Sequence, residues 1–227
     1  MVTYVMLQAF LRAACGIFFP DNCLLCRRFL NSRHQRQLCP DCLECLEFNP
    51  KTASTAVGFA FDQAWSACLY NDTAKKLLHA FKYNAKTSLS KTFVALMIDF
   101  IDRHRLPFNE FDLITPIPLH PARLRERGYN QSLLLSLGLS RHYGIAHTQT
   151  LLARRKMTHT QTELGAKQRW TNMEGAFRMK TSTDLAGKNI VLVDDLFTTG
   201  ATLNAAAQTL KDAGAGRVAA LTFSITV

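Results

Sequence analysis

The run NIVLVDDLFTTGATL, residues 189–203, constrains the fold of this chain more than any other stretch. Residues 190–193 are uninterrupted apolar residues, which favours a strand buried on both faces of a parallel sheet. Two adjacent carboxylates, Asp194 and Asp195, follow at the carboxyl end of that strand. Because open α/β sheets bind their ligands at the carboxyl ends of the strands, this run predicts both a fold class and a binding site.

The turn after the acidic pair has the composition of a phosphate site. Thr198, Thr199 and Gly200 offer hydroxyls, backbone amides and a residue that tolerates positive φ, just before a helix expected to begin near residue 201. Carboxylates do not bind phosphate, so Asp194 and Asp195 must serve sugar hydroxyls or Mg2+. Together these residues predict a ribose 5-phosphate site. A P-loop is excluded because no Gly-Lys-Ser/Thr follows the glycine.

The rest of the chain alternates between strand and helix patterns. Residues 57–70 are expected to form one or two strands with a turn near Asp62, and further strands are expected over 112–119 and 217–225. Helices are expected over 88–104, 132–143 and from about 201 to 213. A further helix starting near residue 72 should bury Leu77, Leu78 and Phe81 and turn three lysines toward solvent, namely Lys75, Lys76 and Lys82. This βαβ alternation predicts a parallel sheet with right-handed crossovers.

Four cysteines near the N-terminus have the spacing of a metal site. Two CxxC pairs are separated by twelve residues and supply Cys23, Cys26, Cys39 and Cys42. Four thiolates suit tetrahedral Zn2+ in a structural role, whereas disulfides are uncommon in cytosolic chains. Cys45 or His34 could replace one of the four ligands. We therefore expect a small four-cysteine, zinc-ribbon-like segment at residues 1–50, followed by an α/β domain at 51–227.

Positive charge is concentrated in one part of the chain. Eleven Lys and Arg residues but three Glu residues lie within residues 121–180, a net +8 out of the formal +10 of the whole protein. Such a patch favours an anionic partner, either a pyrophosphate group or a nucleic-acid backbone. Tyr129, Trp170 and Phe177 are interleaved with these cations, as expected of a surface on which single-stranded bases stack. The alternative is a solvated basic face whose aromatic side chains are buried.

Residues 191–202 resemble the 5-phosphoribosyl-1-pyrophosphate (PRPP) motif of type I phosphoribosyltransferases. Three further features narrow the resemblance to the ComF/GntX family: the cysteine-rich N-terminus, PIPLHPARLRERGYNQ at residues 116–131, and THTQTELGAKQRWTNMEGAF at 158–177. These features span nearly the whole chain. The resemblance implies a flavodoxin-like parallel sheet flanked by helices, with the phosphoribosyltransferase-like domain following the zinc segment.

The resemblance also implies roles for individual residues. Asp194 and Asp195 would hold the ribose hydroxyls together with Mg2+, and the 5-phosphate would bind to Thr198, Thr199, Gly200, Ala201 and Thr202. The pyrophosphate would be bound by Arg123, Arg127 and Arg169.

The ComFC branch of this family acts in DNA uptake during natural transformation. The resemblance therefore implies single-stranded DNA, and other DNA-uptake proteins, as partners. The residues expected to contact DNA are Arg154, Arg155, Lys156, Lys167 and Trp170.

Whether such a protein turns over PRPP is left open by its sequence. Purine-salvage relatives place a carboxylate base where this chain has Thr198, and no acceptor pocket is recognisable. One hypothesis is a PRPP-binding protein of DNA uptake. A second is an active phosphoribosyltransferase with an unidentified nitrogenous acceptor, and a third is a structural adaptor with a vestigial site.

The apolar residues near the start of the chain do not have the pattern of a targeting segment. Residues 2–19 are interrupted by Arg12 and are preceded by no charged segment. They are also too short and too polar to span a bilayer. We therefore expect a cytoplasmic protein without membrane insertion.

Overall fold

The computed structural model describes residues 22–30, 37–51, 54–55, 58–83, 86–156, 173 and 175–226. Its internal contacts divide the chain into two units, Met1–Leu46 and Glu47–Val227. The division lies slightly before the domain boundary that we expect from the sequence, between residues 50 and 51.

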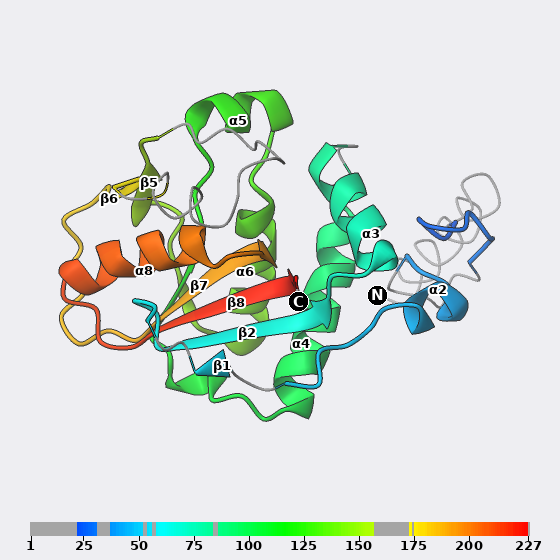
Figure 1. The fold of residues 1–227 in the computed structure, drawn as a ribbon, viewed down its shortest axis with the longest axis horizontal. Helices are drawn as coiled ribbons and strands as arrows, with labels where there is room; N and C mark the ends of the chain where they lie inside the picture. Colours follow the sequence, from blue (N-terminus) through cyan, green and yellow to red (C-terminus); the bar gives the residue numbers. More distant parts are fainter. Residues whose placement is uncertain are drawn as a thin grey trace, which may run out of the picture. The chain divides into compact units, whose positions relative to one another are not determined.

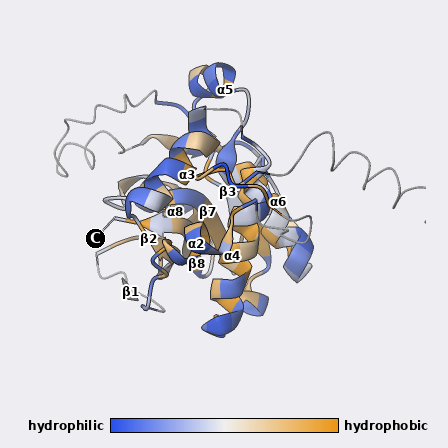
Figure 2. Ribbon diagram, turned by 90° about the vertical axis from the view of Figure 1, so that its right-hand side faces the viewer, coloured by the Kyte–Doolittle hydropathy of each residue, from blue (hydrophilic) through white to orange (hydrophobic). Residues whose placement is uncertain are grey.

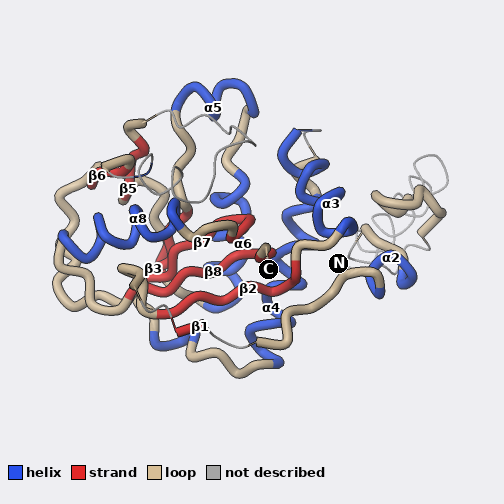
Figure 3. The backbone as a smooth tube through the Cα atoms, viewed as in Figure 1, coloured by secondary structure: helices blue, strands red, loops and turns tan. Residues whose placement is uncertain are grey.

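The larger unit is built on a six-stranded sheet with the order β1-β2-β8-β7-β3-β4 (Figures 1 and 3). Its strands, in that order, are Ser54–Thr55, Gln63–Leu69, Val218–Ile225, Ile190–Phe197, Leu113–Pro116 and Ala146–His147. The last five run parallel, and β1 pairs antiparallel with β2. The predicted parallel α/β sheet is therefore confirmed.

Helices cover both faces of this sheet because its strand residues are apolar on both sides. Ile190 and Leu192 belong to a buried cluster that includes Ala206 of α8 (Ala201–Asp212). On the other face, Phe223 of β8 stacks on Phe93 of α4 (Leu89–Arg103), with 4.1 Å between ring centroids. α6 (Gln131–Tyr143) lies beside α4 (Figure 2). The unbroken apolar runs in the sequence thus reflect burial between two helical layers.

The helix predictions agree with the structure to within a residue or two. The helix expected near residue 72 is α3, Asp72–Tyr83, which buries Leu77, Leu78 and Phe81 as predicted. α6 is capped at its start by Asn130, whose side chain accepts a hydrogen bond from the Ser132 amide. It ends at Gly144, which has a left-handed φ of 69°.

The strand predictions were less accurate. The turn expected near Asp62 is confirmed, since residues 58–62 form a bend and β2 begins at Gln63; the other strands differ more from expectation. β7 does not stop before the acidic pair but continues to Phe197, since Asp194 is in register with Thr222 and Phe197 with Ile225. Short elements that were not predicted include α5 (Pro121–Arg127), η1 (Phe108–Glu110) and the antiparallel strands β5 (Leu152–Arg154) and β6 (Phe177–Met179).

The smaller unit contains α2, Pro40–Glu44, and a bridge between Asn22 and Phe29. Cys23 and Cys39 are buried in it, although few large apolar side chains accompany them among its described residues. None of the helices in the described parts of the chain has the length and hydrophobicity that a membrane span requires.

Candidate functional site

The two adjacent carboxylates on β7 are held by different helices. Asp194 Oδ1 accepts a hydrogen bond from the hydroxyl of Ser132, in the first turn of α6, at 2.7 Å. The same oxygen accepts the backbone N–H of Asp195 at 2.9 Å. Asp195 Oδ1 instead forms a salt bridge of 2.9 Å with Lys82 Nζ, from the last turn of α3. α3 and α6 therefore orient one acid each.

The position of Lys82 corrects the expectation that it faces solvent. Its side chain is 21% exposed, and the side chain of its partner Asp195 is 9% exposed. A carboxylate withdrawn from water to this extent requires a counter-charge. Helical periodicity identifies the buried face of α3 but cannot show that a lysine beside that face reaches a strand more than a hundred residues later. This member of the site is therefore not predicted by the sequence pattern of the helix.

The surroundings of the acidic pair shift the pKa of Asp194 and that of Lys82. Burial, reinforced by the neighbouring Asp195, raises the pKa of Asp194 to about 6. The hydrogen bond from Ser132 and the charge of Lys82 oppose that rise. Burial alone would lower the pKa of Lys82, but the attraction of Asp195 and Asp194 outweighs it and raises the pKa. The lysine is therefore charged at neutral pH.

The turn after β7 leads into the N-terminus of α8. Gly200 is the N-cap of that helix and has φ of 75°, as the sequence analysis expected of this glycine. A Cβ at Gly200 would lie 2.5 Å from Cε1 of Phe59 and 2.8 Å from Cζ of Phe197, so a larger residue does not fit. Thr198 is exposed and Thr199 is half-buried. The turn thus places amides and hydroxyls at a helix N-terminus, a geometry suited to a phosphate.

Two of the three arginines predicted to bind pyrophosphate lie on α5. Arg127 packs over the ring of Tyr83, at 5.3 Å, and its charge partly opposes the rise in the pKa of Lys82 that the two acids cause. Arg123 forms a salt bridge with Glu126 at 3.3 Å and is half-buried. The structure therefore brings Arg127 to the end of α3 that carries Lys82. The third arginine, Arg169, lies outside the described residues.

The residues predicted to contact DNA fall into two groups. Arg154 is half-buried, with its guanidinium 5.6 Å from the ring centre of Phe177. Burial lowers its pKa, and the opposing influence of Asp194 indicates that it lies near the acidic pair. Arg155 and Lys156 are exposed.

The aromatic side chains expected among these cations are only partly placed. Phe177 is 6% exposed and belongs to the buried cluster, so it is not on an open stacking surface and the alternative of a buried aromatic side chain holds for it. Tyr129 is half-buried, and its hydroxyl donates a hydrogen bond to the carbonyl of Phe81. Lys167 and Trp170 lie outside the described residues.

The four predicted cysteines form a compact cluster in the smaller unit. The sulfurs of Cys23, Cys26, Cys39 and Cys42 all lie within 4.8 Å of one another. A tetrahedral zinc site with Zn–S bonds of about 2.3 Å separates its sulfurs by about 3.8 Å, so this donor set has the spacing that Zn2+ requires. Cys45 is exposed and is not in the cluster, and His34 lies outside the described residues.

The thiol of Cys23 already favours the form that binds metals. Burial alone would raise its pKa, but hydrogen bonds from the backbone at Cys39, Cys26 and Leu25 hold it at about 6. A thiolate at neutral pH is the species that coordinates a metal ion.

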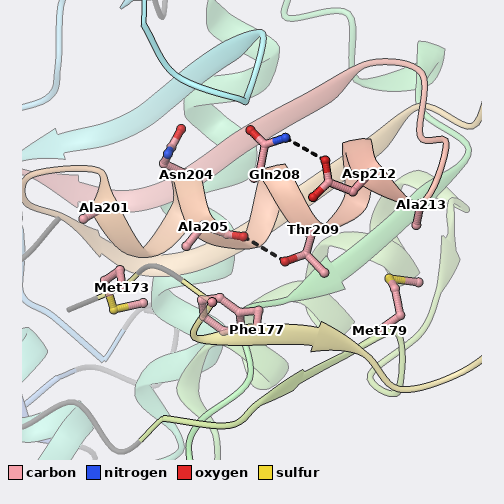
Figure 4. A pocket seen from close by; sticks show the side chains of 11 residues that line it. Met173, Phe177, Met179, Ala201, Asn204, Ala205, Gln208, Thr209, Asp212 and Ala213 are labelled. Atoms are coloured by element: carbon pink, nitrogen blue, oxygen red, sulfur yellow. Dashed lines mark hydrogen bonds between the residues drawn. The ribbon is translucent and has the colours of Figure 1, made fainter. Parts of the chain in front are cut away.

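A pocket of about 690 Å3 lies elsewhere in the larger unit, between α8 and β6 (Figure 4). Phe177 and Met179 line one wall, and Ala205, Gln208 and Asp212 of α8 line the other. Neither acid of β7 contributes to it. The pocket is therefore distinct from the acidic pair.

A parallel sheet that ends in paired acids and a Thr-Thr-Gly turn defines a phosphoribosyltransferase-fold protein. Consistent with this, residues 140–224 match the model of the phosphoribosyl transferase domain. A solved structure of glutamine PRPP amidotransferase from B. subtilis, in complex with ADP and GMP, is similar at 20% identity and a TM-score of 0.33. That similarity covers 49% of this chain and 22% of the solved chain.

Several relatives of this chain are named as competence or DNA utilization proteins. Competence protein F of Haemophilus influenzae is 35% identical over 64% of this chain and 65% of its own length, slightly under two thirds. DNA utilization protein YhgH of Salmonella typhimurium is 28% identical over 86% of each chain. Competence protein ComFC of Bacillus subtilis is 33% identical over 66% of this chain and 58% of its own. The chain is therefore similar to these competence and DNA utilization proteins over a large part of its length.

Proposed function

We propose that this protein binds PRPP at the carboxyl edge of its sheet and acts in DNA uptake and utilization. The observation that carries the proposal is the acidic pair followed by the turn at Gly200, with its left-handed φ at the N-terminus of α8. The match to a phosphoribosyl transferase domain supports the ligand, and the names of the competence and DNA utilization relatives support the process.

In the proposed complex, each part of the site serves one part of PRPP. The carboxylates of Asp194 and Asp195 accept hydrogen bonds from the ribose hydroxyls, and residues 198–202 surround the 5-phosphate. Arg127, together with Arg123 and Arg169, neutralises the pyrophosphate. Mg2+ would enter with PRPP, and its contribution is to compensate the pyrophosphate charge.

Calorimetric titration with PRPP and Mg2+ tests this proposal. The wild type should bind, and the double variant Asp194→Asn, Asp195→Asn should lose at least about 2 kcal/mol of binding free energy, because amides replace the charged acceptors. Asp212→Asn, at the exposed end of α8, is the matched control and should bind as the wild type does. Unchanged affinity in the double variant would rule out the acids as ribose ligands.

We further propose that single-stranded DNA binds to the exposed cations of the larger unit. Arg125 on α5, and Arg155 and Lys156 after β5, are exposed and belong to the part of the chain with net charge +8. Because single-strand binding releases counterions, the logarithm of the affinity should fall linearly with the logarithm of the salt concentration. Replacing Arg155 and Lys156 by Ala should reduce that slope by about 0.7 for each lost phosphate contact. Salt-independent binding would contradict the proposal.

For the smaller unit we propose that Cys23, Cys26, Cys39 and Cys42 hold one structural Zn2+. The compact arrangement of their sulfurs supports this assignment. Zn2+ would supply folding free energy, since a unit of this size cannot bury a large core of its own.

Transfer of the phosphoribosyl group is a second candidate function. Its support is the positive charge of Lys82 and Arg127 near the acidic pair, which could stabilise a departing pyrophosphate. Thr198 occupies the position at which a carboxylate base acts in purine-salvage relatives, so the acceptor would have to enter without that base. Pyrophosphate release, measured across a panel of nitrogenous bases and amines, separates transfer from binding alone.

A further inference from the structure

The salt bridge between Lys82 and Asp195 gives the acidic pair a cation of its own. Lys82 Nζ lies 2.9 Å from Asp195 Oδ1, and both side chains are largely removed from solvent. Its charge also reaches Asp194. With both acids ionised, the two carboxylates and the ammonium carry a net charge of −1 rather than −2.

The end of α3 that carries this lysine is fixed by contacts on several sides. The ring of Phe81 packs edge-on against that of Phe93, with 5.0 Å between centroids. The Phe81 carbonyl accepts a hydrogen bond from Tyr129, and the guanidinium of Arg127 lies over the ring of Tyr83. Lys82 therefore reaches Asp195 from an anchored helix end rather than from a freely moving surface.

Two of the four carboxylate oxygens of the acidic pair already have protein partners. Mg2+ needs near-octahedral oxygen coordination and is usually held by one or two carboxylates together with waters and substrate phosphates. Asp195 Oδ1 is paired with Lys82, and Asp194 Oδ1 already accepts hydrogen bonds from Ser132 and from the backbone. Oxygens held in this way can still accept the weaker, directional hydrogen bonds of a sugar diol.

We propose that Lys82 is the resident cation of the ribose site, so that a ribose 5-phosphate group binds to Asp194 and Asp195 without a divalent metal at the carboxylates. The inference rests on the proposed PRPP function and assigns Lys82 as a positioning residue within it. Mg2+ would then be needed for the pyrophosphate part of PRPP and not for the ribose. Metal dependence should consequently differ between PRPP and ribose 5-phosphate.

Calorimetry with ribose 5-phosphate, in EDTA and in excess Mg2+, tests the inference because this ligand has no pyrophosphate to carry the metal. The wild-type Kd should agree within about threefold between the two conditions. In Lys82→Met, the Kd in EDTA should rise at least about tenfold, and Mg2+ should restore part of the lost affinity. A wild-type protein that requires Mg2+, or a Lys82→Met variant with unchanged affinity in EDTA, would overturn it.

Two variants separate this role from a merely structural one. Lys75→Met removes the same charge from an exposed position of the same helix and should leave both Kd values unchanged. Lys82→Arg retains the cation and should keep binding in EDTA, even where Lys82→Met lowers the thermal stability. If the wild type binds neither ribose 5-phosphate nor PRPP in any metal condition, the proposed function fails and the inference falls with it. If PRPP binds, but the Kd for ribose 5-phosphate does not respond to Mg2+ and to Lys82→Met as described, the inference alone fails.

Discussion

The hydroxyl of Ser132 donates a 2.7 Å hydrogen bond to Asp194 and so joins the first turn of α6 to β7. The start of α6 is itself held by Asn130, whose amide donates to the carbonyl of Ile117 at 3.0 Å, just after β3. The orientation of Asp194 therefore depends on a chain of contacts between two neighbouring strands and the helix that covers them.

Ser132→Ala should weaken PRPP binding by about tenfold, because a hydrogen bond to a charged group contributes about 1.5–3 kcal/mol and here orients a ligand-binding carboxylate. Calorimetry with PRPP and Mg2+ measures the effect. Ser140→Ala is the control, since that serine donates to the carbonyl of Ile145 at the far end of the same helix. Equal losses in the two variants would show that α6 stability, and not the orientation of Asp194, is responsible.

Asp194 should make folding less favourable as the pH rises. Its pKa in the folded protein is about 6, above its ordinary value of 3.8, so the folded state binds more protons between those values. Stability therefore falls as pH rises through that window, and the penalty is complete above about pH 6. Asp194→Asn removes the penalty, and its free energy of unfolding relative to wild type should be higher near pH 8 than near pH 4, by at most about 3 kcal/mol. Urea denaturation at the two pH values measures this difference.

Asp62 should change the pH dependence of folding stability in the direction opposite to Asp194. Burial alone would raise the pKa of Asp62, but hydrogen bonds from Lys211 and from the amide of Val218 hold it below its ordinary value. Its stabilisation is present above the unfolded pKa and is lost as pH falls. Asp62→Asn should therefore destabilise the protein near neutral pH, and less so near pH 3. If the stability of Asp62→Asn and that of Asp194→Asn, each relative to wild type, changed with pH in the same direction, the pKa shifts assigned to both residues would be contradicted.

Gly200→Ala should disrupt the turn before α8. The residue has φ of 75°, and a Cβ there would meet Phe59 and Phe197 at distances below 3 Å. We expect a loss of about 2–3 kcal/mol of stability together with weaker PRPP binding. Gly144→Ala, with φ of 69° but no atom within 4 Å of the new Cβ, should cost about 1 kcal/mol and leave binding intact. Thermal denaturation and calorimetry compare the pair.

The zinc assignment predicts one metal ion per chain. Mass-spectrometric metal analysis should find one zinc in the wild type and less than stoichiometric zinc in Cys42→Ser. Cys45→Ser should retain it, because Cys45 is not in the cluster. Chelation should lower the unfolding temperature of the wild type and affect Cys42→Ser less, since structural zinc contributes to folding. One full equivalent of zinc in Cys42→Ser would show that another residue, and not Cys42, is the fourth ligand.

Much of the fold could be predicted from local patterns. The apolar run before Asp194 identified a strand buried on both faces, and the helix near residue 72 buries the side chains expected of it. The cysteine spacing likewise predicted the compact cluster of sulfurs. In each case the signal lies within a few dozen residues, and one period or spacing is sufficient to produce it.

What the sequence did not reveal depends on contacts between distant elements. Lys82 resembles the solvated lysines Lys75 and Lys76 along the helix, yet it pairs with a strand residue 113 positions later. In the sequence, Arg154 belongs to a run of basic residues that is expected on the surface. In the structure it is half-buried against Phe177 of the neighbouring strand β6. Periodicity describes one element at a time, whereas the ion pairs of a site are decided by how elements are brought together.

The central claim is that the turn at residues 198–202 holds the 5-phosphate of PRPP. Two-dimensional NMR of the 15N-labelled protein, titrated with PRPP and Mg2+, tests it directly because bound phosphate strongly shifts the backbone amides that donate to it. We predict that the largest shifts fall on Thr199, Gly200, Ala201 and Thr202, at the N-terminus of α8. Saturable binding that leaves these amides unshifted would contradict the account.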